Sequence, residues 1–382
     1  MRSCGLVILL AISLTSCVHE PFNSVADQPD IELIWHKSYS SETRNDIDTG
    51  MLWALSFLGA EWPAGSYNKT VVWLNDNRAE LHLDQAGFNP SAAAALSEII
   101  LAAKSSEEYN VHGAFDLGRF VALCLLSSPN YYAITGVPKK LDDFLAGSTI
   151  LNDSAAAIRK STVSKVDRLV HMTDTNEEVN RAKFVAKEGT LDSVSSYFEL
   201  EEFEVMDIMS NGQLRFAVYN KLGDLLNGSD SIYSNGGKPS KCLWCHETNI
   251  NRNFIPHASH PAFVSVDEFN VRVGKWQENL LLFRSTLQTD VEFDQRQNHT
   301  FTELLYIGFM EPSADRLASE WGMEKIEVET LLSSIPKHDH DEFNFMTDLY
   351  HRRDVEDFAP FKSLRVSDDA RELTNFEADL IP

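Results

Sequence analysis

The chain has 382 residues, 43% hydrophobic and 24% charged, so it can bury a sizeable core in water, and its length favours two or more domains. Lys and Arg number 33 against 57 Asp and Glu, which gives a formal net charge of −24. Such a surface repels phosphate backbones and anionic lipid headgroups. We therefore expect no nucleic-acid partner, and we expect any charged protein partner to present a basic face.

The N-terminus has the pattern of an export signal. A short positive start at residues 1–2 precedes an apolar run at residues 6–14, which is too short to cross a bilayer as a helix. Residues 14–17, Leu-Thr-Ser-Cys, resemble the lipobox of bacterial lipoproteins. The resemblance implies removal of residues 1–16 and lipidation of Cys17. The alternative is an ordinary signal peptide that ends near an accidental cysteine.

This resemblance also implies a location. It predicts a cell-envelope lipoprotein of a Gram-negative bacterium, held to the membrane by its lipid anchor alone, because no later apolar run has transmembrane length. Val18 rather than Asp follows Cys17. By the enterobacterial sorting rule this favours the outer membrane, with the protein facing the periplasm or the cell surface.

Residues 17–50 are polar and rich in turn formers, which predicts a lipidated tether, although residues 31–35 have strand-like composition. Residues 51–230 are predicted to form a mixed α/β domain of unknown role. Its Asn-Gly pair within residues 210–213 indicates a hairpin that continues into a meander, because both turn residues accept positive φ. The other expected elements are a hairpin of strands 69–74 and 79–84, helices at 91–104 and 114–127, and strands at 203–209 and 214–219 around the Asn-Gly turn.

Residues 231–382 are predicted to form a mainly helical region. A flexible Gly-rich segment at residues 234–239 leads into it. The predicted fold class is therefore α+β, with an N-terminal mixed part followed by helices. The expected C-terminal helices lie at 266–285, 300–309, 314–321 and 324–333.

One motif carries clear chemistry. Two thiols three residues apart, followed at once by a histidine, occur at Cys242-Leu-Trp-Cys245-His246. This motif resembles the covalent haem-attachment site of the cytochrome c class. The resemblance implies one haem c bound through thioethers to Cys242 and Cys245, with His246 as the proximal iron ligand. It covers about ten residues, and no family is recognised over the remainder of the chain.

The remaining cysteines are consistent with this interpretation. Cys4 leaves with the signal peptide and Cys17 is lipidated, which leaves Cys124 within an apolar run. Core packing is the expected role of Cys124, because burial raises a thiol pKa and suppresses reactivity. The haem-free alternative is a disulfide or a zinc site formed by Cys242 and Cys245.

The sixth iron ligand has several candidates. His257 and His260 lie 11 and 14 residues after His246, far enough in an extended chain to reach the other face of the haem. Met310 resembles the distal methionine of small cytochromes, although Glu311 separates it from the proline that usually follows directly. An open or water-bound position is a further possibility. We favour a histidine, which would give low-spin iron with a low potential.

Other clusters have simpler interpretations. Residues 337–342, Lys-His-Asp-His-Asp-Glu, contain ligands for Zn²⁺ or Ca²⁺ but are expected to form a solvated loop after Pro336. Glutamates 201, 202 and 204 lie on an alternating strand and are expected to form a wet face. Trp244 is expected near the porphyrin. Lys238, Lys241 and Arg252 are candidates to pair with its propionates.

Three functions are consistent with these features. The leading one is electron transfer by a membrane-anchored monohaem lipoprotein. The second is an open-site haem oxidoreductase of peroxidase type, with His257 moving protons. The third is a haem-free binding or structural lipoprotein. No substrate or catalytic residue is identified, and the mature chain is more than three times as long as a small electron carrier.

Overall fold

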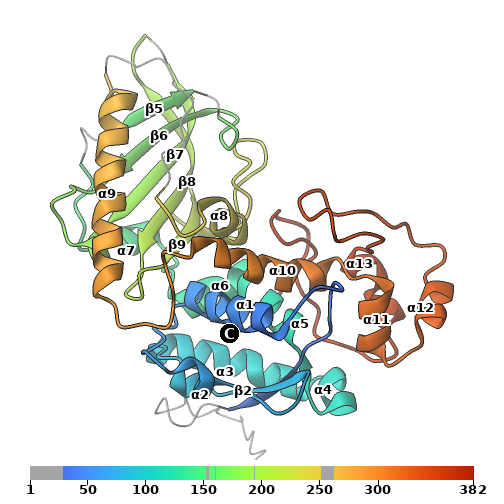
Figure 1. Ribbon diagram of the computed structural model, residues 1–382. Coiled ribbons are helices and arrows are strands. Elements are labelled where there is room, and N and C mark those ends of the chain that lie inside the picture. Colours follow the sequence, from blue (N-terminus) through green and yellow to red (C-terminus); the bar gives the residue numbers. More distant parts are fainter. Residues whose placement is uncertain (1–28, 152–154, 160, 193, 251–261) are drawn as a thin grey trace, which may run out of the picture.

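The computed structural model describes residues 29–151, 155–159, 161–192, 194–250 and 262–382. Within these residues a helical body carries a small β-sheet, a larger sheet stands beside one long helix, and the C-terminal helices form a lobe at the side (Figure 1). The predicted α+β class is confirmed.

The small sheet combines two parts of the N-terminal half. The predicted hairpin is confirmed, because β2 and β3 pair antiparallel with Val71 opposite Leu81. Strand β1 pairs antiparallel with β3 and parallel with β4, in the order β2-β3-β1-β4. The strands are β1 (Ile31–Ile34), β2 (Val71–Trp73), β3 (Arg78–Leu81) and β4 (Phe115–Asp116).

The tether expected over residues 17–50 does not extend to residue 50. The polar run that suggested it is the start of helix α1 (Arg44–Phe57), where Thr43 and Asp46 form a capping box. The helix then buries Met51 and Trp53 completely. Residues 31–50 therefore belong to the folded body, whereas residues 17–28 lie outside the described part.

Helix α10 (His299–Met310), from the C-terminal part, packs against α1 and α5 (Leu117–Leu125). The approach is close, since a Cβ added at Gly50 would lie 2.7 Å from Leu305 and one added at Gly118 would lie 2.7 Å from Phe309. Residues 51–230 and 231–382 therefore share one core. The other helices of this body are α2 (Tyr67–Thr70), α3 (Pro90–Ser105), α4 (Glu107–His112) and α6 (Ser128–Thr135).

The larger sheet is an antiparallel meander of six strands in the order β10-β9-β8-β7-β6-β5. The Asn-Gly hairpin is confirmed: it joins β8 to β9, and Gly212 adopts φ +81°. The meander extends further toward the N-terminus than the sequence indicates. Its strands are β5 (Ala156–Arg159), β6 (Asp167–Met172), β7 (Lys183–Leu191), β8 (Phe198–Ile208), β9 (Leu214–Asn220) and β10 (Leu225–Leu226).

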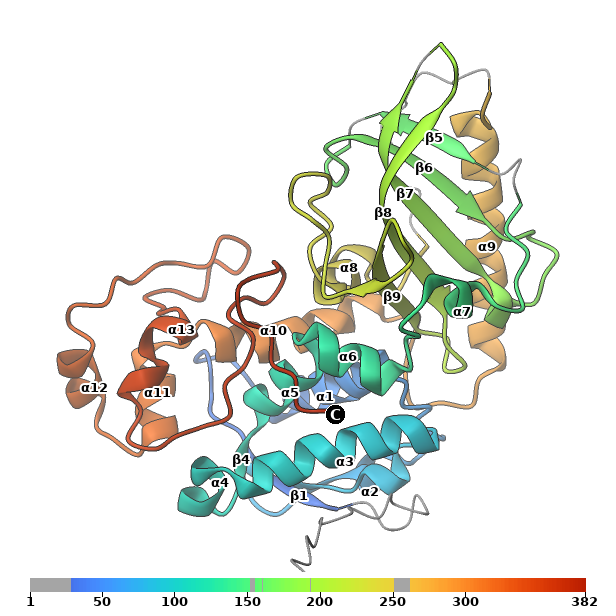
Figure 2. The same ribbon diagram turned by 180° about the vertical axis from the view of Figure 1, so that it is seen from behind.

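Helix α9 (Val266–Thr286) lies along one face of this sheet, where Trp276 packs edge-on against Phe184 (Figures 1 and 2). It matches the helix expected at 266–285. Among the residues that the structure describes, no helix has both the length and the apolar composition needed to cross a bilayer.

The remaining helices form a lobe beside α10 with a small apolar core of its own, which includes Leu317, Val328 and Val355. Helices α11 and α12 match the expected helices at 314–321 and 324–333. The elements are α11 (Ala314–Trp321), α12 (Lys325–Leu331) and α13 (Arg352–Val355), with α7 (Leu141–Leu145) beside the sheet and α8 (Pro239–His246) at its foot.

A buried ionic network joins the lobe to the body. Glu320 accepts two hydrogen bonds from Arg352, at 2.7 and 2.8 Å, and lies 3.4 Å from Arg119. Burial alone would raise the pKa of Glu320, but the neighbouring arginines hold it at about 2. Arg316 pairs with Asp116 at 2.8 Å in the same region. Each buried charge therefore depends on its partners remaining in place.

We predict that Glu320→Gln destabilises the protein by about 3–5 kcal/mol, because it leaves arginine charges buried without their partner. Urea unfolding of wild type and variant measures this. The control is Asp315→Asn, which removes the exposed Asp315–Lys325 pair and should cost less than about 1 kcal/mol. An equal loss of unfolding free energy in the two variants would contradict the claim that the buried network stabilises the fold.

Candidate functional site

Helix α8 carries the motif and has two distinct faces. Residues three and four apart share a helix face, so Cys242, Cys245 and His246 lie together. Leu243 and Trp244 point the other way, into the helical body, where a cavity of only about 10 Å³ remains between α8, α1, α5 and α10. That volume holds no more than one water molecule. Cys242 and His246 are therefore on the side turned toward the sheet, and Cys245 is exposed beside them.

The imidazole of His246 is held in one tautomer. Its Nδ1 lies 3.1 Å from the carbonyl oxygen of Asn249, so Nδ1 donates and the lone pair is on Nε2. Burial lowers the pKa of His246, and the ring packs on Phe216 of β9 with centroids 5.0 Å apart. A neutral imidazole with its Nδ1–H bound to a carbonyl is the usual state of a metal-ligating histidine.

The turn after the motif is held in an uncommon conformation. Glu247 and Thr248 both have positive φ, at 47° and 62°. Arg284 of α9 fixes this turn by donating to the Thr248 carbonyl at 2.6 Å and to its Oγ1 at 2.7 Å, and it also binds the Gly212 carbonyl. Burial lowers the pKa of Arg284 to about 9, so it stays charged at neutral pH. Nothing in the sequence around Arg284 indicated this role.

A buried charge cluster faces the motif from the sheet. Arg168 of β6 binds Glu188 of β7 and Glu204 of β8, the latter at 2.7 Å. Glu204 also accepts hydrogen bonds from Ser229 and Ser234. In the register of the sheet these three charged residues share a face with Phe216, the face that α8 and α9 cover. The charges of Arg168 and Glu204 act on His246, and that of Glu204 raises the pKa of Cys242 after the larger effect of burial.

The prediction that glutamates 201, 202 and 204 form a solvent-exposed face is therefore wrong for two of them. Glu202 is only 2% exposed, and Glu204 is held by Arg168. The loop that carries Asp230 covers this side of β8, and its backbone N–H donates to Glu202. Burial raises the pKa of Glu202 to about 8 and that of Glu188 to about 7.

The Gly-rich segment at residues 234–239 is built into the fold rather than exposed. Lys238 is fully buried and donates to Glu377 at 2.9 Å and to the carbonyl oxygens of Leu126 and Asp369. It therefore ties the start of α8 to the C-terminal tail and is not a partner for haem propionates. Lys241 pairs with Glu372.

The remaining predicted site residues lie in several different places. Trp244 lies on the core-facing side of α8 beneath Arg371, whose guanidinium carbon is 3.9 Å from the ring centroid, so its predicted place beside the porphyrin is not supported. Met310 is buried in α10, which lies against the core-facing side of α8, so the helix packing does not favour it as a ligand opposite His246. Cys124 is fully buried in the core, as expected. Cys17, Arg252, His257 and His260 lie outside the described residues.

A cleft of about 660 Å³ lies between residues 226–237, which precede α8, and the C-terminal tail. The charged side chains of its lining are acidic, and they include Asp230, Glu372 and Asp379. This matches the acidic balance of the whole chain.

Comparisons with protein-family models, with curated proteins and with solved structures gave no match to this chain.

The pKa of Glu202 leads to a prediction about pH. A carboxyl whose pKa is raised by folding destabilises the folded state progressively as pH rises from its ordinary value, 4.5, toward about 8. Glu202→Gln removes this penalty. The free energy of unfolding of the variant, relative to that of wild type, should therefore increase over that pH range by on the order of 1–3 kcal/mol. Urea unfolding at pH 5 and pH 8 measures the change.

The control for this prediction is Glu201→Gln, on the opposite face of β8, which removes the surface pair with Lys221. Its effect should stay below about 1 kcal/mol at both pH values. A difference between Glu202→Gln and wild type that does not vary with pH would contradict the raised pKa.

Proposed function

We propose that the chain is a membrane-anchored, c-type cytochrome-like lipoprotein that transfers electrons through one covalently bound haem. The observation that carries the proposal is the joint placement of Cys242, Cys245 and His246 on one face of α8, with the Nδ1 of His246 bound to a carbonyl. This placement suits two thioether bonds and an iron bond through Nε2. The bound haem would supply reversible one-electron chemistry at iron.

The surrounding residues suit such a group. Phe216 supports the imidazole ring, and the turn at Thr248 is fixed by Arg284, so the proximal histidine is oriented before haem binds. Arg168 is a partly buried cation whose charge acts on His246, so it is a better candidate than Lys238 for the basic residue beside the bound group. The acidic cleft between residues 226–237 and the C-terminal tail favours a redox partner with a basic face.

The haem-free zinc alternative is less well supported. A structural zinc ion holds its ligand atoms a few ångströms apart. Among the described residues, Cys242, Cys245 and His246 do not form a group with ligand atoms within 4.8 Å of one another. Thiols one helical turn apart match attachment to two separate positions on a porphyrin edge better.

The first test is haem attachment in a bacterial host with c-type maturation machinery. Wild type should retain haem on a denaturing gel, and Cys242→Ala with Cys245→Ala should lose it, because both thioether bonds are then gone. Cys124→Ala is the matched control, since Cys124 is a buried core thiol that does not belong to the motif, and it should keep haem. Wild type without covalent haem would overturn the proposal.

The spectrum of the same protein distinguishes electron transfer from the open-site oxidoreductase. We expect low-spin iron with His257 or His260 opposite His246, so wild type should not bind carbon monoxide rapidly. Replacing both histidines by alanine should give high-spin iron that does bind it. Rapid binding by wild type would favour the enzyme, and a high-spin change in Met310→Ala alone would identify the methionine as the ligand.

The anchor is tested separately. Because the lipobox resemblance makes Cys17 the site of acylation, Cys17→Ser should abolish labelling with radioactive palmitate and shift the protein from the membrane to the soluble fraction. Membrane retention of the unlabelled variant would contradict a purely lipid anchor.

A further inference from the structure

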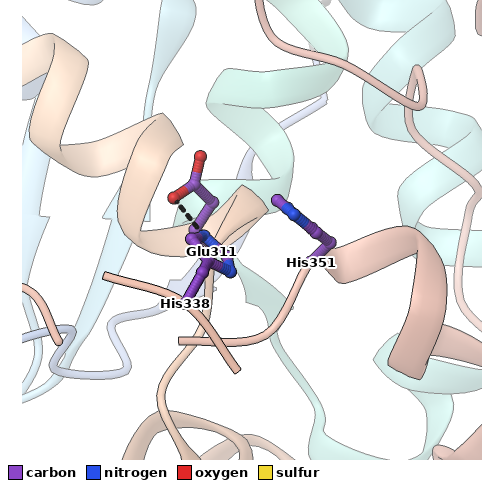
Figure 3. A group of neighbouring side chains, drawn as sticks. All are labelled: Glu311, His338 and His351. Carbon is purple, nitrogen blue, oxygen red and sulfur yellow. Dashed lines mark hydrogen bonds and ion pairs between the residues drawn. The ribbon is translucent and has the colours of Figure 1, made fainter. Parts of the chain in front are cut away.

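A second cluster of metal-ligating side chains lies in the C-terminal lobe, away from the haem motif. Glu311 follows the last residue of α10, His351 precedes α13, and His338 comes from the loop between α12 and α13. One ligand atom from each lies within 4.8 Å of those of the other two (Figure 3). The sequence separates these residues by 27 and 13 positions, so no local spacing indicates the group.

The side chains already contact one another. His338 Nε2 lies 2.8 Å from a carboxylate oxygen of Glu311. The imidazoles of His338 and His351 stack with centroids 4.1 Å apart and planes 19° from parallel (Figure 3). All three residues are half-buried. Water therefore has access to the group, while the fold holds its orientation.

Backbone pairing fixes the three segments to one another. His338 and Leu349 exchange two hydrogen bonds, at 3.0 and 2.8 Å, and Tyr350 N–H donates to the Pro312 carbonyl at 3.0 Å. Tyr350 is almost fully buried in the small core of the lobe. The positions of the three ligands are therefore set by the fold and do not depend on a loose surface loop.

The electrostatics suit a bound cation. Two stacked imidazoles cannot both be protonated without repulsion, and the Glu311 carboxylate supplies negative charge beside them. A divalent cation would satisfy the nitrogen lone pairs and the carboxylate together.

We propose that Glu311, His338 and His351 bind one Zn²⁺ ion. Two imidazole nitrogens and one carboxylate oxygen form a common ligand set of tetrahedral zinc, with the fourth position left for water or another ligand. At zinc–ligand distances of about 2.0–2.1 Å the ligand atoms of a tetrahedral site stand roughly 3.3 Å apart. Side-chain rotations that move the ligand atoms by about 1–2 Å would therefore complete the site. Bound zinc would join the end of α10 to α13 and so fasten the lobe to the body.

The loop at residues 337–342 thus contributes one ligand rather than forming a site by itself. His340, two residues after His338, has a different role, because its Nδ1 accepts hydrogen bonds from the backbone N–H groups of Glu342 and Phe343. His340 is therefore a control of the same residue type in the same loop.

The test uses the full-length protein in detergent, stripped with EDTA and titrated with Zn²⁺ in a calorimeter. Wild type and His340→Gln should bind one equivalent, and zinc should raise their melting temperature. His338→Gln, His351→Gln and Glu311→Gln should each weaken binding on the order of 100-fold, since loss of even an outer-shell partner costs 10–100-fold. Circular dichroism verifies that each variant is folded.

A second variant separates this site from zinc at the cysteines. Cys242→Ala with Cys245→Ala removes both thiols and should still bind one Zn²⁺ with unchanged affinity. The proposal is overturned if wild type binds no zinc, if the cysteine substitutions abolish binding, or if His340→Gln weakens binding as much as His338→Gln does. Failure of haem attachment would leave the zinc prediction unaffected, because the two sites share no residue.

Discussion

The division of helix α8 into two faces is the constraint on which the candidate site depends. Leu243 and Trp244 complete the packing between α8 and the helical body, which leaves almost no free volume on that side. Cys242 and His246 must then face the large sheet, where Phe216, Arg168 and Glu204 lie on one face. A helix of only eight residues cannot turn its thiols elsewhere without losing this packing. The orientation of the motif is therefore a consequence of core formation.

Burial of cations is the second organising feature. In a chain with a net charge of −24, Arg119, Arg316, Arg352 and Lys238 are all at most 2% exposed and bind carboxylates or carbonyls inside the fold. These contacts join segments far apart in sequence, including the C-terminal tail and the start of α8. Among the described residues, eight acidic and six basic side chains are buried, so the surface keeps nearly the whole acidic balance of the composition. This agrees with the expectation of a basic partner surface.

Regular elements were predictable because their signals are local. The Asn-Gly turn between β8 and β9, the capped helix α3 and the helices α9 to α12 all follow from periodicity and turn chemistry. Three features were not predictable: the burial of Glu202, the hydrogen bonds from Arg284 to Thr248, and the grouping of Glu311 with His338 and His351. Each depends on chain segments that meet only in the folded protein, so a single sequence contains no local pattern for it.

The most direct test of the central claim is peptide mass spectrometry of protein matured in a host that attaches haem c. Trypsin cleaves after Lys241 and Arg252, so it releases residues 242–252, which contain both thiols and His246. The account predicts that this peptide carries the mass of one haem, bound through both cysteines. Recovery of the peptide without haem, with its cysteines as thiols or as a disulfide, would contradict it.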